Sequence, residues 1–222
     1  VLHDGLSGVE ETLNSDLQMG LGPVPLVGGS AGDDLSFRST RVLVGDRFRS
    51  RTSGLLAIRT HAPIHLFKFQ HFAPGDSPLV ITAADPSTRT VFEIDGRPAV
   101  EAYCERTRVA EADLGPQHFA RHPLVVELEG DAYVRSIQRR DADGSLRLFC
   151  AIEEGVVATI GADLEPLAAA REALAAARRG VGATGLVLGF DCILRALEAQ
   201  DRAFAAPLEA LYREHRVLGC HT

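Results

Sequence analysis

The chain has 222 residues, a formal net charge of −7 and an apolar content of 45%, which indicates a soluble globular protein with a sizeable core. The acidic balance excludes a general binder of nucleic acids or anionic membranes, and no apolar run reaches the ~18 residues of a membrane span. The four cysteines form no C-x-x-C pair, so we expect reduced thiols in a cytoplasmic protein and no zinc site of the paired-cysteine kind.

Hydrophobic periodicity predicts an α+β fold in which antiparallel sheets are packed with helices. Residues 1–22 predict a strand, a turn and a helix. From Arg41 the apolar period becomes two, which predicts a series of strands; in the strand expected over 65–72, His65 and His71 would share one face with two phenylalanines. The further expected elements are a helix over 96–107, an antiparallel meander over 122–160, a helix over 164–180, and a strand and helix from 185.

The last part of the chain resembles the first. Residues 1–4 match residues 187–191 as a strand that ends in aspartate, and a helix and a short strand into a glycine turn follow in both. The two turns are Gly28-Gly29-Ser30-Ala31 and Gly219-Cys220-His221-Thr222, and counting from the first glycine pairs Ser30 with His221. We interpret the likeness as a diverged duplication that gives two strand–helix–strand halves, with a coincidence of common patterns as the alternative.

The segment Gly28-Gly29-Ser30-Ala31-Gly32 fits the G-x-S-x-G pattern of a hydrolase nucleophile. Such a serine needs a helix directly after it, whereas here a polar segment and a strand follow. A phosphate loop is disfavoured as well, since the lysine of that motif is absent and Asp33 and Asp34 would repel a phosphate. We therefore expect a ligand-contacting turn formed by Gly28, Gly29, Ser30 and Asp33. A serine hydrolase that uses Ser30 is the alternative.

Three arginines and two histidines complete the candidate ligand-binding residues. Arg97, Arg135 and Arg195 stand singly in apolar surroundings, so each either pairs with a structural carboxylate or grips a carboxylate of a ligand. His71 lies on the aromatic face of its expected strand, and His122 precedes a proline at the start of another strand. Either imidazole is a candidate haem ligand, and the alternative for both is a half-buried structural position.

Several segments resemble the FIST family, with its N-terminal and C-terminal parts. They read PLVGGSAGDD, FKFQHFAPGDSPLVITAADPSTRTVFEIDGRPAVEAY, HPLVVELEGDAYVRSIQ, LRLFCAIEEGVVATI and LVLGFDCILRALE. The resemblance covers nearly the whole chain and implies a FIST N-like part over 1–162, incomplete at its N-terminus, and the start of a FIST C-like part over 163–222, truncated at its C-terminus. The second glycine turn departs from the Gly-Phe-Ser-Thr-Tyr-Gly-Glu pattern of the family.

The resemblance implies a bacterial sensory domain that is not an enzyme. It would bind a small ligand and regulate a signalling protein such as a histidine kinase or a diguanylate cyclase. Some members resemble nitric-oxide-sensing haem proteins, so haem held by His71 or His122 is a further expectation. An amino-acid-type sensor without haem is the alternative. The expected setting is the cytoplasm, without nucleic-acid or membrane partners, and a homodimer is one expected assembly.

Overall fold

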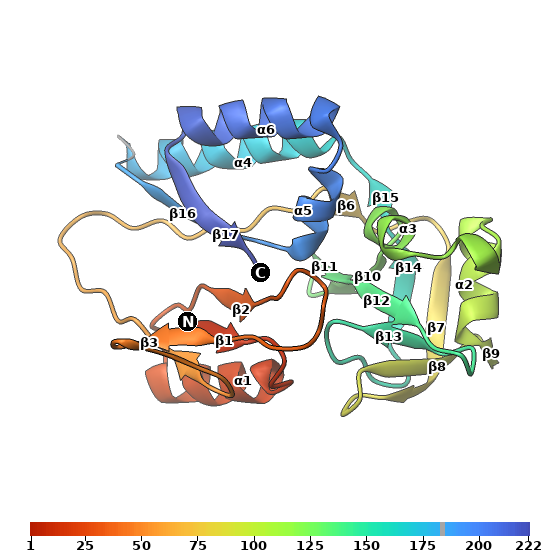
Figure 1. Ribbon diagram of the computed structural model, residues 1–222. Coiled ribbons are helices and arrows are strands. Elements are labelled where there is room, and N and C mark those ends of the chain that lie inside the picture. The colour runs from red at the N-terminus through yellow and green to blue at the C-terminus, as the bar shows by residue number, and fades with distance from the viewer. Residues whose placement is uncertain (183–184) are drawn as a thin grey trace. The chain divides into compact units, whose positions relative to one another are not determined.

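The computed structural model describes residues 1–182 and 185–222, which divide into two compact units (Figure 1). Unit 1 comprises Val1–Lys68 and Arg171–Thr222, and unit 2 comprises Phe69–Ala170. Helices and mostly antiparallel sheets are combined in one chain, so the predicted α+β class is confirmed. No helix within the described ranges has the length and apolar character that are needed to cross a membrane.

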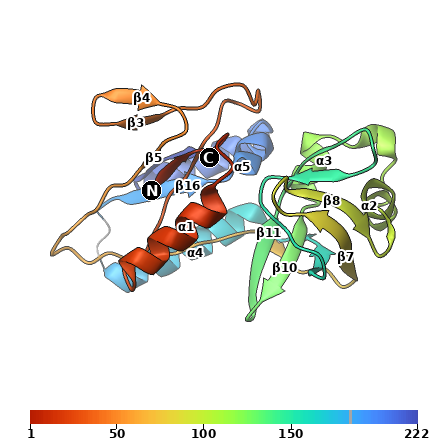
Figure 2. The ribbon, with the colours of Figure 1, turned by 90° about the horizontal axis from the view of Figure 1, so that it is seen from below.

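Unit 1 contains two strand–helix–strand elements and a small hairpin. Its elements are β1 (Leu2–Asp4), α1 (Glu10–Leu21), β2 (Gly29–Ala31), β3 (Val42–Val44), β4 (Arg47–Arg49), β5 (Ser53–Gly54), β16 (Val187–Asp191), α5 (Ile193–Glu198), α6 (Arg202–Glu214) and β17 (Val217–His221). Helix α4 (Pro166–Val181) begins in unit 2 and continues into unit 1. In both views α1 lies against one side of the sheet of β1, β2 and β5 (Figures 1 and 2).

The two halves predicted from the sequence are present as two pairs of parallel strands, β1–β2 and β16–β17, each with helical structure between its strands. The aspartate that ends β1 lies opposite Ala31, and the aspartate that ends β16 lies opposite His221. Aligned on these aspartates, Ser30 corresponds to Cys220. The predicted correspondence of Ser30 with His221 is therefore wrong by one residue, because strand pairing sets the register and the position of the first glycine does not.

Unit 2 is built around one large antiparallel sheet. Its elements are β6 (Phe72–Ala73), β7 (Pro78–Asp85), β8 (Thr90–Ile94), β9 (Arg97–Pro98), α2 (Ala99–Thr107), the 3₁₀ turn η1 (Glu111–Asp113), α3 (Pro116–Arg121), β10 (Leu124–Leu128), β11 (Asp131–Arg135), β12 (Ile137–Arg140), β13 (Leu146–Leu148), β14 (Val157–Ile160) and β15 (Ala162–Asp163). The strand order is β11-β10-β14-β7-β8-β13-β12, with β9 paired to β8. The short strands β6 and β15 pair with each other.

The core of unit 2 lies between this sheet and α2 and α3. Along β7 the exposed and buried positions alternate, so Leu79 and Ile81 point inward and belong to the same buried cluster as the apolar residues of α2. Tyr103 of α2 and Phe119 of α3 are among the most deeply buried side chains. Each aliphatic side chain buried in this way stabilises the unit by about 1.5–3 kcal/mol relative to its exposed state.

The segment 55–71 differs from its prediction, because residues 55–71 form no strand in the described structure. Its large apolar side chains, including Leu56, Ile58 and Ile64, are exposed. Alternation gives a segment the preference for an extended conformation, but a strand also needs a neighbour that takes up its backbone hydrogen bonds. The expected strand face of His65 and His71 is therefore wrong.

Candidate functional site

The first glycine turn is placed where only glycine fits. At Gly28 an added Cβ would overlap the carbonyl oxygen of Val1, and at Gly29 it would overlap the side chain of Thr222. Glycine has no Cβ, which allows this close approach of backbone to neighbouring groups. Both predicted glycines are thus explained by packing within unit 1, and their role toward a ligand stays a prediction.

Asp4, at the end of β1, anchors the loops around this turn. The carboxylate is buried and accepts hydrogen bonds from the Thr40 hydroxyl and from the backbone N–H groups of Arg51 and Leu6. Burial on its own would raise the pKa of the Asp4 carboxyl, but the three hydrogen bonds outweigh burial and lower that pKa. Asp4 therefore stays ionised and ties β1 to the segments at residues 40 and 51.

Ser30 has a carboxylate as its neighbour. Its hydroxyl donates a hydrogen bond to Oε1 of Glu10, in the first turn of α1, at 3.2 Å. His3 lies opposite Ser30 on β1, but Nδ1 of His3 is 2.7 Å from the Ser53 hydroxyl and Nε2 is 3.0 Å from Oδ1 of Asn14. With both ring nitrogens engaged, His3 is not placed to take the proton of Ser30 as a hydrolase base would.

Asp33 is engaged by its own loop. Its carboxylate accepts backbone N–H bonds from Phe37 at 2.8 Å, from Arg38 at 2.6 Å and from Ser39 at 2.9 Å. The donors of Ser39 and Arg38 contribute most to lowering the pKa of the Asp33 carboxyl. A ligand that binds Asp33 would compete with these three bonds, which give Asp33 a structural role in its loop. Ligand contact by Asp33 stays a prediction.

The second glycine turn carries an aspartate and a tyrosine. Asp191 ends β16, and its Oδ2 accepts a hydrogen bond from the Tyr212 hydroxyl of α6 at 2.9 Å. Burial raises the pKa of Tyr212, and the Asp191 carboxylate adds to the rise. Thr222 closes this turn, because its N–H and its hydroxyl both donate to the carbonyl oxygen of Asp191, at 2.6 and 3.1 Å.

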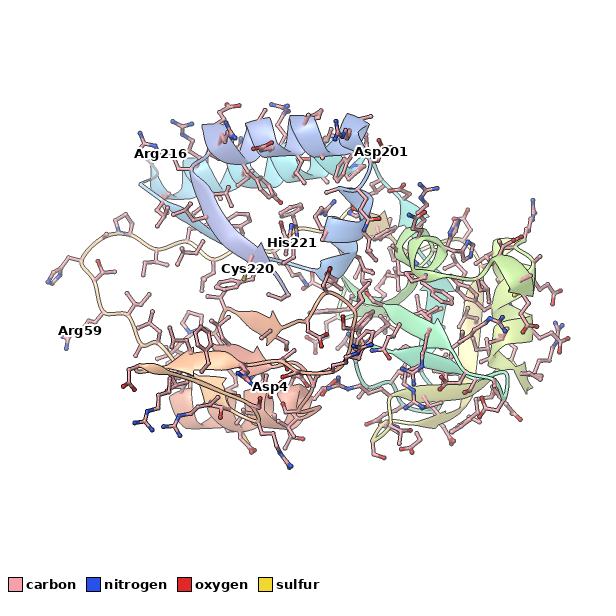
Figure 3. All side chains as sticks on the ribbon, viewed as in Figure 1. Asp4, Arg59, Asp201, Arg216, Cys220 and His221 are labelled. Carbon is pink, nitrogen blue, oxygen red and sulfur yellow. The ribbon has the colours of Figure 1, made fainter. Side chains whose placement is uncertain are left out.

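The two turns meet inside unit 1. The side chain of Thr222, directly after β17, packs against the backbone of Gly29 in β2. Cys220 and His221 lie just before Thr222 and are both exposed (Figure 3). The two strand–helix–strand elements thus each supply one turn to the same contact. The polar groups of these turns are the hydrogen-bonded pairs Ser30–Glu10 and Asp191–Tyr212.

Two of the three predicted arginines are held in ion pairs. Arg97 of β9 is half-exposed and pairs with Glu101 at 2.6 Å and with Glu105, and these two carboxylates raise its pKa. Arg195 of α5 is 8% exposed, pairs with Glu198 at 3.0 Å and lies over the ring of Phe204. Ion pairs with structural acids, the alternative given by the sequence, thus occupy both guanidinium groups.

Arg135 stands on β11 opposite Leu124 of β10, and is half-buried. It belongs to unit 2, as Arg97 does, whereas Arg195 belongs to unit 1. Ligand binding by these three arginines therefore stays a prediction for each one separately.

The two candidate haem ligands have protein neighbours. The His71 side chain is 8% exposed, its Nε2 is 4.0 Å from Oδ1 of Asp163, and its ring packs against Phe72. His122 ends α3 and stacks on His118 with ring centroids 4.5 Å apart. No group of three or more His, Cys, Asp and Glu side chains that could hold a metal ion occurs within residues 1–182 and 185–222.

Sequence reasoning missed the partners of the turn residues. Glu10, Thr40 and Tyr212 were not among the candidate site residues, although each bonds to a residue of the turns or of the strands that lead to them. No local pattern points to these three contacts, because they span 20, 36 and 21 residues.

The fold and these turns define an α+β protein with two strand–helix–strand elements whose glycine turns meet. The chain belongs to the FIST family: the model of the FIST N domain matches residues 1–97, and that of the FIST C domain matches residues 99–222. FIST domains are sensory domains of signal-transduction proteins and not catalytic ones. No curated protein and no solved structure matches the chain. The two matches meet near residue 98, whereas the sequence had placed the boundary near Asp163.

Proposed function

We propose that this chain senses a small polar ligand bound at the two glycine turns of unit 1. The observation that carries the proposal is the contact of Thr222 with Gly29, which joins the turns of the two strand–helix–strand elements. Membership of a family of sensory domains supports the same function. A ligand that contacts both turns would favour the arrangement in which they meet, and this preference for one conformation is what a signal requires.

The polar groups of the turns suit an amino-acid-type ligand without haem. The carboxylates of Glu10 and Asp191 accept hydrogen bonds from the hydroxyl groups of Ser30 and Tyr212. The negative charge of these two carboxylates would attract the ammonium group of the ligand. Transmission of the signal to a histidine kinase or a diguanylate cyclase is the finer part of the proposal.

A thermal-shift screen of amino acids and small amines tests this function. A ligand that binds only the folded chain raises the melting temperature, by the equivalent of about 2.7 kcal/mol at one hundred times its Kd. The shift should shrink in Ser30→Ala, which removes the hydroxyl bonded to Glu10. It should persist in Ser87→Ala, whose hydroxyl bonds to Asp85 on the surface of unit 2. No shift with any compound, or equal loss in both variants, would contradict the proposal.

Haem-based sensing of nitric oxide is a more specific form of the proposal. His71 or His122 would hold the iron, and haem would supply the site for the gas. The neighbours Asp163 and Phe72 at His71, and His118 at His122, are those of structural imidazoles, so nothing in them favours haem. The test is the Soret band of haem-reconstituted protein with and without nitric oxide. A band that is lost in His71→Ala or in His122→Ala supports this form, and a flat spectrum removes it.

A further inference from the structure

The surface of unit 1 contains an open cavity of about 420 Å³ that the proposed ligand site does not use, and its three arginines are exposed. It is lined by residues of α4 and of the C-terminal end of α6, namely Arg171, Ala175, Arg178, Arg179, Glu214 and His215. Both helices run in the same direction in Figure 1, so their C-terminal ends lie on the same side of the unit. This volume falls within the range of about 300–1,000 Å³ that is typical of sites for small molecules.

The lining is strongly cationic in a chain of net charge −7. In the described part of the chain no carboxylate pairs with Arg171, Arg178 or Arg179. The three guanidinium groups beside this cavity are thus left available for another anion.

Helix electrostatics alone does not account for the cluster. Arg178 and Arg179 occupy the last turn of α4, where cations offset the partial negative charge of a helix C-terminus. Arg171 stands two turns earlier and receives no benefit of that kind, because the effect falls off within one turn. Its position seven residues before Arg178 places it on the same face of α4, toward the cavity.

The charge balance of the lining favours an anion. Glu214 is the one carboxylate of the lining, and it lies 3.9 Å from Nε2 of His215. Three guanidinium groups against one carboxylate leave an excess of two positive charges. The two helix ends offset about half a charge each, so the cavity stays positive. His215 adds an imidazole as a further hydrogen-bond donor.

We propose that this cavity binds the phosphate groups of a small molecule, with Arg171, Arg178 and Arg179 as the anchoring residues. The guanidinium fork matches two oxygens of one phosphate, and its hydrogen bonds to an ionised oxygen are about twice as strong as neutral ones. The site is distinct from the glycine turns, so a phosphate compound could act as a second signal on the same unit.

Titration calorimetry on the full chain tests the site, with inorganic phosphate, pyrophosphate and ADP as probes at constant ionic strength. We expect pyrophosphate to bind, and Arg171→Gln/Arg178→Gln to weaken that binding by about tenfold or more. The matched control is Arg121→Gln/Arg202→Gln, which removes the same charge from two exposed arginines outside the cavity. The control should bind like the wild type, and circular dichroism should show that both variants are folded.

Equal affinity for pyrophosphate and ADP would show that the cavity recognises the phosphate groups alone. Tighter binding of ADP would show that it also recognises the nucleoside. Ser30→Ala should leave the binding of both probes unchanged, which separates this site from the glycine turns. The proposal is overturned if none of the three probes binds. It is overturned as well if the cavity and control variants lose affinity equally, because only general charge attraction would then be at work.

Discussion

At the scale of residues, buried polar groups are satisfied by partners that are distant in the sequence. The Asp4 carboxylate binds groups at Thr40 and Arg51, and His3 binds Asn14 and Ser53. Such bonds fix loops that hydrophobic packing alone would leave free, because breaking one leaves a desolvated polar atom. The polar framework around the first glycine turn is therefore part of what holds unit 1 together.

His118 is the exception among the described residues. Its Nε2 is buried without a hydrogen-bond partner, while its ring stacks on His122 and meets Tyr103 edge-on at 5.8 Å. Burial lowers the pKa of His118, and the neighbouring His122 lowers it further. The neutral form of this imidazole thus fits its surroundings better than the charged form.

Protonation of His118 should destabilise the protein. The folded state takes up this proton at a lower pH than the unfolded chain, whose histidine has a pKa near 6.5. The unfolded state therefore binds more protons below that value, and the free energy of unfolding falls as the pH falls. Urea unfolding from about pH 7.5 to about pH 5 measures this loss. It should be smaller in His118→Phe and unchanged in His61→Gln, a change at an exposed histidine.

If His118→Phe keeps the full pH dependence of the wild type, another group causes it and the buried imidazole has no part. A change in the urea slope, without a change in the midpoint, would point to the compactness of the unfolded state instead.

At the scale of elements, the sequence predicted those whose partner lies nearby. The hairpin of β10 and β11 belongs to the predicted meander, and α2 follows from its helical period after Pro98. Residues 41–48, which alternation predicted as one strand, are instead divided between β3 and β4. The segment 55–71 alternates equally well but forms no strand, because a pairing partner is not a property of the segment. The predicted correspondence of Ser30 with His221 was off by one residue for the same reason, because the pairing of β16 with β17 sets the register.

The candidate site was predictable to a similar extent. Glycine turns and aspartates at strand ends can be recognised in the sequence, and both turned out to lie together in unit 1. The bonds of Ser30 to Glu10 and of Asp191 to Tyr212 could not be predicted. They depend on how each helix is rotated over its strands, which is decided by tertiary packing.

At the scale of the whole molecule, the two family parts are interleaved and do not stand side by side. In unit 2, β7 and β8 come from the FIST N part and pair with β14 and β13 of the FIST C part. In unit 1, Gly29 of the first part packs against Thr222 of the second. The change from strands to helix near Asp163, which suggested a boundary in the sequence, marks the start of α4 and lies close to the end of unit 2.

This interleaving predicts which fragment folds alone. Residues 69–170 contain the whole buried cluster of unit 2 in one continuous segment, so they should unfold cooperatively when expressed by themselves. Residues 1–97 should not, because β7 and β8 would lose β14, β13 and the apolar face of α2. Thermal unfolding followed by circular dichroism decides the matter. A cooperative transition in fragment 1–97, or none in fragment 69–170, would mean that the family boundary also divides the folding units.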